Sequence, residues 1–235
     1  MTTSDTVETL EIAAPIASTE SVQPEKQQAA KPKPKSKQEP KLDVQPVLQK
    51  LFELYPHLFG NSFLPLKLGT YQDLMAAHPE VFQKDSLKAA LGFHARSTRY
   101  LQCVAAGNQR HDLQGNAVED VSPEHVYLAL LELFRRRIIT NNKSRTQLDL
   151  RPLFRKQLIA AFEASGLSRQ EYQLRVQTNE AGATLLLEES LAEYDAKFAK
   201  QTALKRAFEA SGKKTAEFAE MYGLDLVEVE EMLQK

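Results

Sequence analysis

The chain has 235 residues, of which 42% are hydrophobic, and a formal net charge of −1. This length suffices for one domain of about 100 residues with additional segments, or for two small domains. The single cysteine, Cys103, excludes an internal disulfide and a cysteine-based zinc site, and the sequence has no run of about 18 apolar residues that would span a membrane.

The small net charge hides a strong segregation of charged residues along the chain. Residues 26–50 contain seven basic and two acidic residues, 81–111 contain five and one, and 133–156 contain eight and one. By contrast, residues 112–132 contain five acidic and no basic residues, and 157–235 contain nine basic and fourteen acidic residues. The basic blocks can bind a polyanion, whereas the acidic ones cannot.

Residues 1–42 are predicted to be a disordered, Lys/Pro-rich arm, because they have few large apolar side chains. Within the arm, KPKPKSKQEPK at 31–41 fits two interpretations, a solubilising tether or a non-specific phosphate-binding arm. The first 25 residues contain no Lys or Arg and no apolar core, so we expect no secretory signal there. Together with the single cysteine, this favours a cytoplasmic location.

The first predicted helix covers residues 43–60, with Pro56 and Gly60 ending it. Thr70 is expected to cap a short helix over 71–77.

A single helix is predicted for residues 84–102. Its apolar face repeats every three or four residues, at Leu87, Leu91, His94, Thr98 and Leu101. A second, basic face has the same periodicity, at Lys84, Lys88, Gly92, Arg96 and Arg99, with Tyr100 at its edge.

After Gly107, weak alternation around a Gln-Gly-Asn turn predicts a small β-hairpin over 109–121. Ser122 and Pro123 then read as the N-cap and the first residue of a helix. That helix is expected to end at Arg135–Arg137, which either extend a nucleic-acid surface or interact with the helix dipole. Residues 138–150 are interpreted as a basic linker.

The remaining part, 151–235, contains an internal repeat. AFEASG occurs at 161–166 and again at 207–212, which predicts a duplicated helix–turn–helix unit with each first helix ending at Ser-Gly. Residues 215–233 have the outline of a DNA-reading helix-turn-helix, but their acidic residues would repel DNA phosphates. Protein interaction or self-association is therefore favoured for this region, and DNA binding is not.

Four separated blocks in the middle of the chain resemble the ProQ/FinO family of bacterial RNA chaperones. These are PLKLGTYQDL at 65–74, LKAAL at 87–91, SxRYL at 97–101 and AGNQRHDLQGN at 106–116. The resemblance covers about residues 43–137. It implies a compact helical FinO-like domain that includes a small β-hairpin. With the disordered arm before it and the helical C-terminal repeat region after it, we expect a mostly α (α+β) fold.

The resemblance also implies a function. Family members bind structured small RNAs, typically a terminator-type hairpin with a 3′ single-stranded tail, stabilise them and promote RNA–RNA pairing in post-transcriptional regulation. Small RNAs and mRNA 3′ hairpins are thus the expected partners, and we expect no association with a membrane. The alternative is a protein-interaction scaffold or transcriptional adaptor that acts through residues 151–235.

Six RNA-binding positions carry over from the family: Lys67, Lys84, Lys88, Arg99, Tyr100 and Arg110. Tyr100 is expected to stack on a base or to bond a phosphate, and Arg110 to bind a phosphate through its guanidinium fork. Arg96 is a cation that the family pattern does not require, Gly92 replaces a usual basic residue, and His94 replaces a usual aromatic. Ser122 is added because the N-terminus of a helix offers free backbone N–H groups to an anion.

No catalytic arrangement is found: the sequence has no Walker loop, no HExxH and no GxSxG. Its five histidines show no metal-ligand spacing. We therefore expect no enzyme activity, no catalytic or metal-binding residues and no cofactor.

Overall fold

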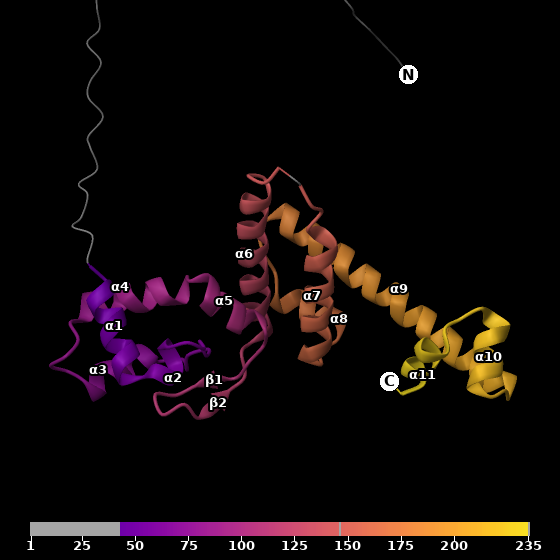
Figure 1. Ribbon diagram of the computed structural model, residues 1–235, viewed down its shortest axis with the longest axis horizontal. Helices are drawn as coiled ribbons and strands as arrows, with labels where there is room; N and C mark the ends of the chain where they lie inside the picture. Colours follow the sequence, from indigo (N-terminus) through magenta and orange to yellow (C-terminus); the bar gives the residue numbers. More distant parts are fainter. Residues whose placement is uncertain (1–42, 146, 235) are drawn as a thin grey trace, which may run out of the picture. The chain divides into compact units, whose positions relative to one another are not determined.

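The computed structural model describes residues 43–145 and 147–234, so the predicted N-terminal arm lies outside the described residues. The regular secondary structure of the described part is helical apart from one small hairpin, which confirms the predicted fold class (Figure 1). None of the described helices has the length and apolarity required to cross a membrane.

The first predicted helix is in fact two. α1 covers Gln45–Leu54 and α2 covers Pro56–Phe59. The interruption lies at Tyr55, because proline disfavours the helical conformation of the residue before it. α3 covers Thr70–Ala77, and its N-cap is Gly69 at a φ of 90°. The prediction of Thr70 as a cap was wrong: its hydroxyl donates to the carbonyl of Lys67 in the preceding turn.

The predicted single helix over 84–102 is also interrupted, at Arg96 and Ser97. α4 covers Lys84–Ala95 and α5 covers Thr98–Ala105. Ser97 has an extended backbone and its Oγ accepts a hydrogen bond from the amide of Tyr100, 3.2 Å away, so it is the N-cap of α5. The break changes the helical phase, and Thr98 is consequently exposed rather than buried as predicted.

The predicted hairpin is confirmed. β1 (Arg110–His111) and β2 (Ala117–Glu119) are antiparallel, with Arg110 opposite Glu119. The carboxylate of Asp112 accepts bonds from the amides of Gln114 and Asn116, which closes the turn. On its other side, β1 forms a parallel bridge between His111 and Leu66, so the segment before α3 lies against the hairpin.

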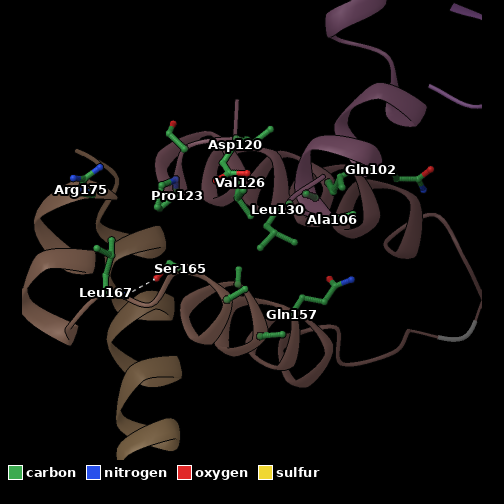
Figure 2. Close-up of a pocket in the computed structure, with 18 of the residues that line it drawn as sticks. Gln102, Ala106, Asp120, Pro123, Val126, Leu130, Gln157, Ser165, Leu167 and Arg175 are labelled. Carbon is green, nitrogen blue, oxygen red and sulfur yellow. Dashed lines mark hydrogen bonds between the residues drawn. The ribbon is translucent and has the colours of Figure 1, made fainter. Parts of the chain in front are cut away.

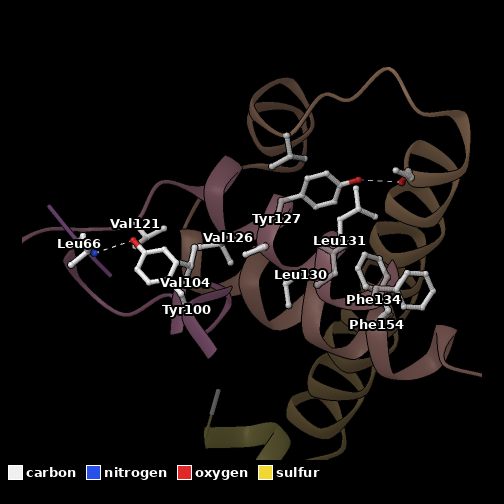
Figure 3. Close-up of a cluster of buried hydrophobic side chains, with 14 of the residues drawn as sticks. Leu66, Tyr100, Val104, Val121, Val126, Tyr127, Leu130, Leu131, Phe134 and Phe154 are labelled. Carbon is white, nitrogen blue, oxygen red and sulfur yellow. Dashed lines mark hydrogen bonds between the residues drawn. The ribbon is translucent and has the colours of Figure 1, made fainter. Parts of the chain in front are cut away.

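α6 covers Pro123–Asn141 and begins at the predicted Ser122–Pro123 junction. It extends four residues beyond Arg137, so the first residues of the predicted 138–150 linker are helical. Its buried side chains lie in the main core of the described chain (Figure 3) and include Val126, Tyr127, Leu130, Leu131 and Phe134. α6 packs against α5 and, on another side, against the helices that follow it in the chain.

The C-terminal part consists of helices alone. They are α7 (Arg151–Ser165), α8 (Arg169–Arg175), α9 (Ala181–Ser211), α10 (Thr215–Tyr222) and α11 (Leu226–Gln234). As the repeat predicts, α7 and α9 each end at a serine followed by a glycine in the left-handed conformation, Gly166 at a φ of 63° and Gly212 at 61°. The long helix α9 is therefore shared, because its beginning belongs to the first repeat and its end to the second.

Candidate nucleic-acid interface

Three cations form a row along α4, which we call the basic ridge: Lys84, Lys88 and Arg96. All three are exposed, and Lys84 and Lys88 are one helical turn apart. Gly92 lies between Lys88 and Arg96 in this row and carries no side chain. A Cβ atom there would lie 3.6 Å from the guanidinium of Arg96, so the Arg96 side chain lies back along the helix over the glycine. The basic ridge can follow a phosphate backbone.

Arg99 lies at the beginning of α5 and is held in place from one side. Its guanidinium carbon lies 4.4 Å from the centre of the Phe63 ring, and the guanidinium donates to the carbonyl of Asn61. The residue remains exposed, so Arg99 is a pre-oriented cation beside the segment that leads into α3.

Tyr100 and Arg110 point inward and bind the two backbone polar groups of one residue, Leu66, in an arrangement that we call the clamp. The hydroxyl of Tyr100 accepts a hydrogen bond from the amide of Leu66 at 3.1 Å (Figure 3). The guanidinium of Arg110 donates to the carbonyl of Leu66 at 3.0 Å. Tyr100 is only 9% exposed and Arg110 is buried. Leu66 is thus fixed by two side chains from outside its own segment, and neither aromatic face nor guanidinium fork is open to solvent.

Lys67 follows this clamped residue. Its amide donates to the carbonyl of His111 at 2.9 Å, which completes the attachment of the segment to the hairpin. Its ammonium group lies 2.8 Å from a carboxylate oxygen of Asp73, and that hydrogen bond raises the pKa of Lys67. Lys67 is half-buried beside an acid, and is a more restrained cation than those of the basic ridge.

Polar contacts connect the clamp to the N-terminus of α6. The second guanidinium nitrogen of Arg110 lies 3.1 Å from Nδ1 of His125, and the same nitrogen of His125 lies 2.8 Å from Oγ of Ser122. Ser122 does not cap α6 with its side chain. Nothing in the spacing of the sequence indicates this connection, because β1 and α6 become neighbours only in the folded domain.

Ser122 also lines a groove of about 800 Å³ between the α5–α6 region and α7–α8. Both polar and apolar side chains line this groove. The polar side chains are Gln102, Asp120, Ser122, Arg137, Gln157, Ser165 and Arg175. Figure 2 shows Arg175 near one end of the row of labelled residues and Gln102 near the other, with Val126 and Leu130 between them.

Arg135–Arg137 lie within α6, and each of the three arginines contacts a neighbouring element. Arg135 pairs with Glu180, and Arg137 donates to the side chain of Gln157 at 3.3 Å. Arg136 donates to the carbonyl of Arg96 at 2.9 Å, at the break between α4 and α5. Arg136 therefore supports the geometry of the basic ridge.

His94 occupies the centre of an aromatic cluster. Its ring centre lies 4.8, 4.5 and 5.1 Å from those of Phe59, Phe63 and Tyr100. Burial, with a further contribution from the charge of Arg99, lowers the pKa of His94 to about 4. The imidazole is neutral at pH 7 and takes the place of an aromatic ring.

The described residues contain no group of three or more His, Cys, Asp or Glu side chains that could hold a metal ion.

The ProQ/FINO family model matches residues 42–146 of the chain, which confirms the resemblance seen in the sequence. Proteins named RNA chaperone ProQ from Shewanella pealeana and Shewanella halifaxensis are each 40% identical over 88 residues, which is 36% of this chain and 42% of each relative. The chain thus spans about two fifths of the length of these curated relatives. A crystal structure of a FinO-like RNA chaperone from Neisseria meningitidis is similar at 31% identity and a TM-score of 0.34, over 37% of this chain and 88% of that one.

Proposed function

We propose that this chain is an RNA-binding protein that acts as an RNA chaperone, because residues 42–146 match the ProQ/FINO family model. Its ligands are structured small RNAs and mRNA 3′ hairpins, each with a terminator-type stem and a 3′ single-stranded tail. The protein stabilises such RNAs and promotes their pairing with other RNAs, without a catalytic step. The names of the curated relatives support the RNA-chaperone part of the proposal.

The basic ridge is the feature that carries the proposal. Lys84, Lys88 and Arg96 are exposed on one side of α4, and Arg99 adds a fixed cation after the break. An A-form stem is recognised by its shape, through phosphates and 2′-hydroxyls. A straight row of cations matches the phosphate backbone of such a stem and binds it by releasing counterions.

The clamped segment supplies Lys67 as a further phosphate contact. Its position depends on the clamp, since Tyr100 and Arg110 hold the preceding residue, Leu66, through its N–H group and its carbonyl. We therefore propose that Tyr100 and Arg110 act on RNA through Lys67, as positioning residues. Direct contact of either side chain with RNA stays a prediction, and it requires the side chain to leave its present hydrogen bond.

The groove at Ser122 is the proposed path of the 3′ tail. Its volume of about 800 Å³ accommodates a short stretch of a nucleotide chain. Arg137 and Arg175 line the groove and provide positive charge for the phosphates. Ser122, at the start of α6, lies where backbone N–H groups face an incoming phosphate.

A gel shift at fixed salt with one terminator hairpin in three forms tests the choice of ligand. The forms have a U-tail with a free 3′-hydroxyl, the same tail with a 3′-phosphate, and no tail. Tight binding to the first form alone supports recognition of the 3′ end. Equal binding to all three would mean a general basic RNA surface, and no binding to any form would contradict the proposed function.

The stem contact is tested with Lys84→Ala/Lys88→Ala. Each lost phosphate contact reduces the slope of log K against log salt by up to about 0.9, so the double variant is expected to flatten it by roughly 1 to 2. Lys197→Ala/Lys214→Ala removes the same charge from two exposed positions at α9 and before α10, and should leave the slope unchanged. If both double variants behave alike, the basic ridge is not the stem-binding surface.

A further inference from the structure

The two helices that carry most cations of the proposed RNA surface meet at residues 96–98, which we call the junction. α4, which carries the basic ridge, packs on α1 and α3, whereas α5, which carries Arg99, packs on α6. The two helices thus pack mainly on different neighbours. The angle between them decides how the basic ridge and Arg99 are placed relative to one another.

Aromatic rings hold the inner side of the junction. The ring centres of His94, in the last turn of α4, and Tyr100, in the first turn of α5, lie 5.1 Å apart. Both rings are buried, and Tyr100 also belongs to the clamp. On this side the two helices are therefore joined by packing.

Arg136 of α6 holds the exposed side of the junction. Its Nη1 donates to the carbonyl of Arg96 at 2.9 Å and lies 3.2 Å from the hydroxyl oxygen of Thr98, to which it also donates. Arg96 is the C-cap of α4, where backbone carbonyls lack a partner within the helix and carry partial negative charge. One guanidinium thus bridges the end of α4 and the beginning of α5.

Glu132 orients this guanidinium. It lies one turn before Arg136 in α6, and its carboxylate accepts a hydrogen bond from Nε of Arg136 at 2.8 Å. The carboxylate also offsets the charge of Arg136, which makes this arginine a weaker ligand for a phosphate. The pair is therefore suited to holding oxygen atoms of the protein rather than those of RNA.

The turn of α6 that carries Arg136 is itself attached to the C-terminal helices. Arg135 pairs with Glu180, the N-cap of α9, and Arg137 donates to Gln157 of α7 at 3.3 Å. Three consecutive arginines thus contact three different parts of the chain, and the middle one contacts the junction. The position of Arg136 is fixed before any RNA binds.

A small change of angle at the junction has a large effect on the basic ridge. α4 has 12 residues, and a rise of about 1.5 Å per residue gives it a length of about 18 Å. A rotation of about 20° at the junction would displace Lys84, at the far end of α4, by about 6 Å. This is about twice the length of a charge-assisted hydrogen bond, so the basic ridge and Arg99 would no longer fit the same phosphate backbone.

We propose that Glu132 and Arg136 form a positioning pair for RNA binding. The pair fixes the angle between α4 and α5, so that the basic ridge and Arg99 contact one RNA together. This inference rests on the proposed function and adds to it two residues that act through the junction. It has one consequence that electrostatics alone would reverse: an acidic residue beside a basic surface increases the affinity for a polyanion.

The affinity of the full chain for the tailed terminator hairpin, measured by gel shift at fixed salt, tests the pair. Arg136→Lys keeps the charge, but an ammonium group lacks the planar fork that binds Glu132 and the junction together, and we expect at least about fivefold weaker binding. Glu132→Ala should weaken binding by at least about threefold, although it removes a negative charge. The matched control Arg135→Lys makes the same change one residue earlier and should keep the affinity within about twofold.

Two further measurements separate positioning from direct contact and from unfolding. Arg136→Met should weaken binding without changing the slope of log K against log salt. A slope lower by about 0.9 would mean that Arg136 itself binds a phosphate, which would overturn the proposal. Without RNA, amide hydrogen exchange of residues 96–101 should be faster in Arg136→Lys than in the unmodified chain, while circular dichroism shows an unchanged helix content.

The proposal is also overturned if Arg136→Lys binds the hairpin as tightly as the unmodified chain does, or if Glu132→Ala binds it more tightly. In both cases the RNA-binding function itself would stand, because the unmodified chain binds. If the unmodified chain does not bind the hairpin, the proposed function fails, and this inference fails with it.

Discussion

Removing one oxygen atom from Tyr100 separates a positioning role from a direct RNA contact. Tyr100→Phe keeps the ring and loses the hydroxyl that accepts the hydrogen bond of the Leu66 amide at 3.1 Å. Leu66 is buried, so its N–H group would be left without a partner, at a cost of about 1–3 kcal/mol. This corresponds to a roughly 5- to 150-fold larger opening equilibrium of the segment.

Hydrogen exchange of a peptide covering residues 64–69 measures that opening directly, and a gel shift with a tailed hairpin gives the RNA affinity. We expect faster exchange of the Leu66 amide and an affinity lower by no more than about tenfold, because Lys67 is displaced but not removed. Tyr71→Phe is the control, since the hydroxyl of Tyr71 has no hydrogen bond to the described residues. Unchanged exchange together with a larger loss of affinity would show that the hydroxyl contacts RNA and would refute the positioning role.

Two further predictions concern buried side chains. His94 has a pKa of about 4 in the folded chain and about 6.5 when unfolded, so the unfolded state binds the proton first as the pH falls, and stability is lost between pH 6.5 and 4. The free energy of unfolding, measured in urea titrations, should fall by about 2 kcal/mol between pH 7 and 5. His94→Phe should remove most of this pH dependence. An equal pH dependence in the variant would show that other groups cause it. Tyr172 is fully buried, and its hydroxyl has no partner among the described residues, whereas the second repeat has Phe218 at the same place. Tyr172→Phe should therefore be neutral or raise the midpoint of thermal unfolding, and a loss of more than about 1 kcal/mol would reveal a hydrogen bond that the hydroxyl makes.

The sequence by itself determined the elements whose signals are local. The Ser122–Pro123 start of α6, the hairpin around Gly115 and the Ser-Gly ends of α7 and α9 all occur where the sequence predicts them. Each depends on residues within one turn of the chain, through a cap, a fixed φ or a left-handed glycine. The basic ridge was equally visible, because exposed cations one helical turn apart need no tertiary partner to be recognised.

The break at Tyr55 directly precedes Pro56, which the sequence analysis names as an end signal, whereas the break at Ser97 lies in a segment with continuous helical periodicity and was missed. At Ser97 the periodicity agreed with a single helix, and the competing signal was one serine whose hydroxyl caps the next helix. That break sets the rotation of α5 and so decides which of its side chains are buried.

Only the tertiary structure decided the direction of Tyr100 and Arg110. Tyr100 follows Arg99 in the sequence, and both Tyr100 and Arg110 match family positions, which favoured contact with RNA. In the fold, Leu66 has one backbone N–H and one carbonyl that no strand pairs, and burial makes unpaired backbone groups costly. The two side chains satisfy these groups from 34 and 44 residues away along the chain, a distance at which spacing in the sequence carries no signal.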